Sequence, residues 1–144
     1  MEDGVGYARL NLEAGEQFVS LRRALGVTTV GMNQLLLEPG ARWRIHRHVH
    51  QEEVYLVLEG VLSLSVEGEE RDLGPGELAR VAPSVRRQLI NRGPGRLVIL
   101  ALGGMGEHAG RDAEAFFTWD DHEAKQVAEV PFPEPLPDAE LRTG

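Results

Sequence analysis

Hydrophobic and polar positions alternate along the chain over short stretches, whereas helical spacing is weak throughout. Such alternation places successive side chains on opposite faces and therefore predicts half-buried β-strands. Glycine, proline and asparagine separate the stretches, as expected for tight turns. The predicted strands cover 17–25, 27–40, 42–49, 53–60, 61–70, 78–83, 86–91 and 96–103. About eight to ten strands at this spacing are typical of a β-sandwich or barrel, so we predict an all-β fold.

The alternation stops after Gly103 and Gly104. Residues 120–130 predict a short helix, and the prolines at every second position of 131–137 predict an extended chain. We therefore expect a β-barrel over residues 1–106. An irregular or short-helical extension over 107–144 follows, packed on the barrel or on a partner subunit.

Charge and composition exclude several classes of partner. Residues 107–144 hold 3 basic and 10 acidic groups, a net charge of −7 of the −8 of the whole chain. A nucleic-acid-binding protein needs a basic surface, which this chain lacks. The longest apolar run, 97–102, is far shorter than the ~20 residues that span a membrane. The acidic start MEDG does not resemble a signal peptide, and cysteine is absent, so we expect a cytoplasmic protein without disulfides.

The stretch HRHVHQEEVYLVLEG concentrates the candidate chemistry. In a strand, His46 and His48 point to the same face, and His50 would join them if the strand continued. Glu53 begins the next predicted strand and is the natural third ligand. Two imidazoles and a carboxylate with open positions suit iron, manganese, zinc or nickel.

The spacing of this stretch resembles the first motif of the cupin superfamily. Gly40 is followed after five residues by His46 and His48, then after four residues by Glu53 and after six by Gly60. The resemblance covers roughly residues 20–104. It implies a small double-stranded β-helix, an RmlC-like jelly roll, with the metal site inside the barrel. It also implies pairing of small cupins, so we expect a homodimer.

The second cupin motif is degenerate in this chain. Gly76 and Asn91 fit its two ends, but Arg87 occupies the position of the last metal ligand. Arginine stays protonated and has no lone pair for a metal. At an effective dielectric of about 20, two unit charges 4 Å apart repel by roughly 4 kcal/mol, and a divalent ion would feel about twice that. Three arrangements are open: Arg87 turns away, Arg87 pairs with Glu53 and replaces the metal, or the three remaining ligands hold an ion with water.

Other polar residues extend the candidate site. Arg42 and Arg44 share the strand phase of His46, so with Arg87 they would form a cationic wall suited to a carboxylate or phosphate. Tyr55 shares the phase of Glu53 and either lines the pocket or packs in the core. The sequence thus predicts a small cupin that binds a divalent metal ion, a small anionic ligand, or both. It leaves open a metal-dependent enzyme of the dioxygenase or isomerase type and a non-catalytic, metal-free binding or sensor protein.

Overall fold

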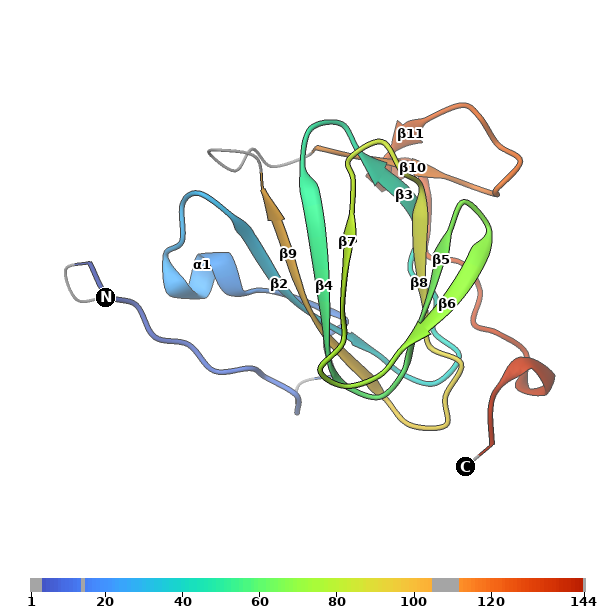
Figure 1. Ribbon diagram of the computed structural model, residues 1–144, viewed down its shortest axis with the longest axis horizontal. Coiled ribbons are helices and arrows are strands. Elements are labelled where there is room, and N and C mark those ends of the chain that lie inside the picture. The colour runs from blue at the N-terminus through green and yellow to red at the C-terminus, as the bar shows by residue number, and fades with distance from the viewer. Residues whose placement is uncertain (1–3, 14, 105–111, 144) are drawn as a thin grey trace.

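Two antiparallel β-sheets face each other in the computed structural model, which describes residues 4–13, 15–104 and 112–143 (Figure 1). One sheet has the strand order β1-β2-β9-β4-β7 and the other β11-β10-β3-β8-β5-β6. The strands are β1 (Phe18–Ser20), β2 (Gly31–Leu37), β3 (Ile45–His48), β4 (Glu52–Glu59), β5 (Leu62–Val66), β6 (Glu69–Leu73), β7 (Leu78–Val81), β8 (Arg87–Ile90), β9 (Leu97–Gly104), β10 (Ala113–Phe116) and β11 (Lys125–Gln126). This jelly roll confirms the predicted all-β fold.

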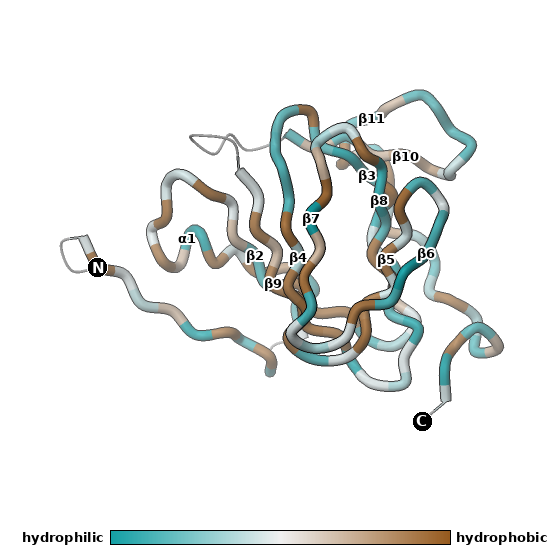
Figure 2. The backbone as a smooth tube through the Cα atoms, viewed as in Figure 1, coloured by the Kyte–Doolittle hydropathy of each residue, from teal (hydrophilic) through white to brown (hydrophobic). Residues whose placement is uncertain are grey.

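The hydrophobic core fills the space between the two sheets. Leu37, Val57, Leu62, Leu89 and Ile99 are fully buried there, and they come from strands of both sheets. Burying such a side chain contributes about 1.5–3 kcal/mol, so the core holds the sheets together. Figure 2 shows that hydrophobic residues gather toward the lower end of the barrel, while the upper part of β3 and β8 is more hydrophilic. The barrel therefore has a packed end and a polar end.

The first predicted strand, 17–25, is wrong in its second half. After β1 the chain forms helix α1 (Leu21–Leu25). The Ser20 hydroxyl accepts the backbone N–H of Arg23 at 3.3 Å, and Gly26 ends the helix with a φ of 79°. The Ser20 hydrogen bond begins the helix, and the left-handed conformation of Gly26 ends it. These local effects outweigh the alternation of the apolar residues.

The C-terminal extension packs against the barrel of its own chain. Strand β10 pairs with β3 in a continuous antiparallel register that runs from Ala113 opposite His48 to Phe116 opposite Ile45. The short helix predicted over 120–130 is reduced to a 3₁₀ helix, η1 (Val127–Glu129), which follows β11 in the second half of this range; no α-helix forms there. The Asp121 carboxylate accepts the backbone N–H groups of Phe117 and Glu123, at 3.3 and 3.0 Å. Such bonds compete with helix formation.

The proline-rich end runs along the barrel and finishes with a second 3₁₀ turn, η2 (Asp138–Glu140). The Leu136 backbone N–H donates to the Gly40 carbonyl at 2.8 Å, and Arg42 Nε donates to the Glu134 carbonyl at 3.0 Å. The Arg44 guanidinium lies 4.0 Å from the ring centre of Phe132. Both arginines therefore hold the extension on the barrel. Among the described residues, no helix is long and apolar enough to cross a membrane.

Candidate metal centre

Three side chains that the sequence singled out meet at the polar end of the barrel. The possible ligand atoms of His46, His48 and Glu53 all lie within 4.8 Å of one another. His46 Nε2 is 3.6 Å from Glu53 Oε1, and His48 Nε2 is 3.2 Å from Glu53 Oε2. Their side chains are only 9–13% exposed. The alternation of β3 puts both imidazoles on one face, and the facing sheet supplies the carboxylate from β4.

His50 does not join this cluster. Strand β3 ends at His48, so the alternation that would have aimed His50 inward is lost. The His50 side chain is 67% exposed, and its Nδ1 lies 3.1 Å from Asp112 Oδ1. The turn after β3 thus limits the cluster to two histidines.

Both histidine rings turn Nε2 toward Glu53. His46 Nδ1 is 3.0 Å from the carbonyl oxygen of Arg44. A carbonyl only accepts, so Nδ1 carries a proton, and Nε2 is the nitrogen that could bind an ion. Neither ring nitrogen of His48 has a hydrogen-bond partner among the described residues, although both are buried. Leaving buried polar atoms unpaired is costly, and an ion bound at Nε2 would remove part of that cost.

Glu53 is held as a carboxylate. Burial raises its pKa, but the neighbouring imidazoles of His46 and His48 outweigh burial and hold the pKa well below its usual range. The Tyr55 hydroxyl donates to Glu53 Oε1, and burial together with the Glu53 charge raises the pKa of Tyr55 well above its usual value. Tyr55 is 1% exposed and belongs to the core, with its hydroxyl occupied by Glu53. Contact between Tyr55 and a ligand stays a prediction.

The Tyr55 hydroxyl should stabilise the fold through Glu53. We expect Tyr55→Phe to lower the free energy of unfolding by about 1.5–3 kcal/mol, the usual size of a hydrogen bond to a charged group. Urea unfolding measures this change. Tyr7→Phe is the matched control, because Tyr7 is 79% exposed. Equal stability of Tyr55→Phe and the unchanged chain would show that Glu53 does not depend on this hydroxyl.

Arg87 lies beside the cluster and is fully buried, with 0% exposure. It stands directly opposite His46 in the β3–β8 pairing, so both side chains share a face. Arg87 Nη1 donates to the Val85 carbonyl at 2.9 Å, and Nη2 lies 3.5 Å from the carbonyls of Val81 and Ala82. Arg87 Nε is 3.8 Å from Glu53 Oε1 and has no hydrogen-bond partner among the described residues.

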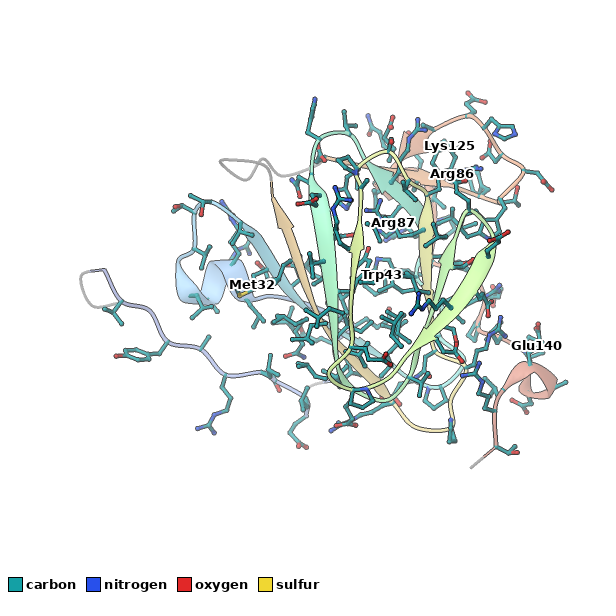
Figure 3. All side chains as sticks on the ribbon, viewed as in Figure 1. Met32, Trp43, Arg86, Arg87, Lys125 and Glu140 are labelled. Atoms are coloured by element: carbon teal, nitrogen blue, oxygen red, sulfur yellow. The ribbon has the colours of Figure 1, made fainter. Side chains whose placement is uncertain are left out.

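This geometry excludes one of the three arrangements considered for Arg87, the two-bond pair with Glu53. Its terminal nitrogens turn to the backbone between β7 and β8, so it does not form a two-bond pair with Glu53. Only Nε faces the carboxylate. Figure 3 shows Arg87 in the space between the two sheets. The guanidinium charge therefore remains near the cluster, while its hydrogen-bonding capacity is largely used elsewhere.

A cavity of about 220 Å³ adjoins the three residues. Its wall includes Phe18, Asn33, Trp43, Arg44 and Asp112. Arg44 lines this cavity, and its Nε also donates to the Val130 carbonyl. Burial lowers the pKa of Arg44. Contact between Arg44 and an anionic ligand stays a prediction. Arg42 instead binds the backbone of the extension.

Sequence reasoning did not anticipate Phe18, Asn33 or Asp112 in this wall. Asn33 precedes the motif, and Phe18 lies in a strand interpreted only as a structural element. Asp112 reaches the site because β10 pairs with β3. None of these placements has a local sequence signal, since each depends on which distant strands pair.

The comparisons with known proteins agree with this architecture. Residues 33–103 match the family model described as Cupin domain. The chain contains a cupin domain. The first cupin motif thus lies within the matched residues, and the degenerate second motif supplies Arg87 in the same barrel.

Solved cupin structures are similar to this chain over most of its length. A cupin protein from Bacteroides fragilis is 25% identical, with a TM-score of 0.59, covering 68% of this chain and 83% of its own. A protein from Silicibacter pomeroyi, named a sugar phosphate isomerase from a cupin superfamily, is 23% identical with a TM-score of 0.61, covering 91% of this chain and 94% of its own. At such identity the second likeness shows the fold alone. No curated protein matches the chain.

Proposed function

We propose that this cupin holds one divalent metal ion between His46, His48 and Glu53 and binds a small anionic ligand in the adjacent cavity. The observation that carries the proposal is the convergence of three largely buried ligand side chains within 4.8 Å. His48 supports it further, because both of its ring nitrogens are buried and neither makes a hydrogen bond among the described residues. Two imidazoles and a carboxylate suit zinc, nickel, iron or manganese and leave positions open for water or a ligand. A bound ion would act there as a Lewis acid.

The charges around the cluster favour an anionic ligand. Glu53 supplies one negative charge, and the buried Arg87 beside it offsets that charge. The charge of a divalent ion would then be compensated only in part, by the Asp112 carboxylate in the cavity wall. Arg44 adds a further positive charge at the cavity wall. A ligand that brings its own carboxylate or phosphate would balance this excess.

Sugar phosphates are suitable first compounds to test. They are named for the Silicibacter pomeroyi protein, and they combine metal-binding hydroxyls with a phosphate suited to Arg44. Isomerase activity would be a further step for the same site. It would require the ion to polarise a carbonyl of the substrate.

One observation favours a metal-free alternative. Glu53 already accepts the Tyr55 hydroxyl and lies 3.8 Å from Arg87 Nε. In this alternative the polar residues recognise an anion directly, and the protein acts as a binding or sensor cupin without catalysis.

Elemental analysis of the untagged protein separates the two functions. We expect about one zinc, nickel, iron or manganese ion per chain, either as purified or after addition of the metal. Less than about a tenth of an equivalent, with no uptake from any of the four metals, would refute the metal centre and favour the metal-free alternative. Calorimetric titration with a sugar phosphate and the matching neutral sugar then tests whether the ligand must be anionic.

A further inference from the structure

Asp112 lies directly before β10, in the C-terminal extension, and its side chain is only 6% exposed. Its Oδ2 accepts the backbone N–H groups of His50 and Gln51, at 2.9 and 2.8 Å. Its own carbonyl accepts the Val49 N–H at 3.0 Å. These donors form the turn between β3 and β4, the two strands that carry the cluster. One aspartate of the extension thus fixes the connection between the candidate metal ligands.

The same carboxylate approaches a ring nitrogen of His48. Asp112 Oδ2 lies 3.5 Å from His48 Nδ1, which is ion-pair distance and longer than a hydrogen bond. A carboxylate oxygen only accepts, so this contact favours the proton of His48 on Nδ1.

The two histidines of the cluster have matching surroundings. Each presents Nε2 to Glu53, and its Nδ1 faces an oxygen that can accept, at hydrogen-bond distance in His46 and at ion-pair distance in His48. For His46 the acceptor is the Arg44 carbonyl on the same strand. For His48 it is Asp112, from a distant part of the chain. An acceptor at Nδ1 fixes the ring orientation and keeps the lone pair on Nε2, where a metal would bind.

We propose that Asp112 is a positioning residue for the metal centre, which holds His48 with its proton on Nδ1 and its lone pair directed at the ion. The inference rests on the proposed metal function. Asp112 is not itself a ligand, because it lies on the Nδ1 side of the ring, and the described residues place only His46, His48 and Glu53 in the cluster. The C-terminal extension thereby becomes part of the site.

Asp112→Asn tests this role, with Asp120→Asn as the matched control. Both changes remove one negative charge from the extension, but Asp120 is exposed and precedes the turn to β11. Titration with Zn²⁺ or Co²⁺ should show affinity about 10–100-fold lower for Asp112→Asn, the usual effect of losing a carboxylate behind a histidine ligand. Asp120→Asn should stay within about twofold of the unchanged chain.

Ring-nitrogen NMR of the metal-free protein gives an independent measurement. Both ring nitrogens of His48 face a carboxylate, Nε2 at 3.2 Å from Glu53 and Nδ1 at 3.5 Å from Asp112. The share of His48 that carries its proton on Nδ1 should therefore fall in Asp112→Asn, while His46 keeps Nδ1–H through Arg44. An unchanged His48 tautomer in Asp112→Asn would overturn the inference, even if the affinity fell through loosening of the turn. If the unchanged chain binds no metal, the proposed function fails, and the tautomer measurement still decides whether Asp112 orients His48.

Discussion

Replacing His48 by alanine should abolish metal binding and leave the barrel folded. The change removes one of three candidate ligands, so the loss of affinity should exceed the ~10–100-fold typical of changes behind a ligand. The barrel should survive because the His48 ring has no hydrogen-bond partner among the described residues and lies outside the core cluster. Calorimetric titration with Zn²⁺ and thermal unfolding measure the two effects.

His122→Ala is the matched control for this change. It also removes an imidazole, but His122 is exposed and lies outside the cluster. His50 is less suitable as a control, because its Nδ1 lies 3.1 Å from Asp112. The metal affinity of His122→Ala should remain within a fewfold of that of the unchanged chain. Unfolding of His48→Ala would show instead that this histidine is structural, and retained tight binding would exclude it as a ligand.

The sequence predicted the three-residue cluster because its geometry follows from strand alternation. His46 and His48 lie two positions apart on one strand, so a correct β assignment put both on one face, and the spacing of the motif added Glu53, the second residue of the next strand. The spacing of the second motif also put Arg87 at the position of a metal ligand, and the structure pairs this residue with His46. The direction of the guanidinium could not be predicted, because the carbonyls of the β7–β8 turn determine it.

Two other features depended on interactions that the alternation does not encode. Helix α1 interrupts an apolar stretch because Ser20 and Gly26 cap it at both ends. Asp112 contacts the turn after β3 because β10 adds to the edge of that sheet. The first could be recognised from the cap residues themselves. The second depends on long-range strand pairing, for which the acidic extension gives no local signal.

Replacing Arg87 by histidine should raise the affinity for Zn²⁺ or Ni²⁺ by about 100-fold or more. The change removes a buried positive charge beside the carboxylate ligand and adds a nitrogen donor opposite His46. A hundredfold gain corresponds to about 2.7 kcal/mol, well below the roughly 8 kcal/mol Coulomb limit for a divalent ion 4 Å from a guanidinium. Competition with a chromophoric chelator measures affinities in this range.

The substitution should also carry a cost in stability. Arg87 is fully buried and donates to backbone carbonyls of the turn between β7 and β8. Losing these bonds and the packing around them should lower the free energy of unfolding by about 1–3 kcal/mol. Urea unfolding of the metal-free protein measures this cost separately from metal binding, and bound metal should then restore part of the stability.

Arg87→Met separates the two causes of the expected gain in affinity. Methionine removes the charge and keeps an unbranched side chain, but it adds no imidazole donor. An increase shared by Arg87→Met and Arg87→His would show that the charge of Arg87 limits metal binding. A further increase in Arg87→His alone would show that the side chain reaches the ion as a fourth ligand. Unchanged affinity in both folded variants would mean that the Arg87 charge does not act on the ion, and that the weakness expected from the degenerate second motif has another cause.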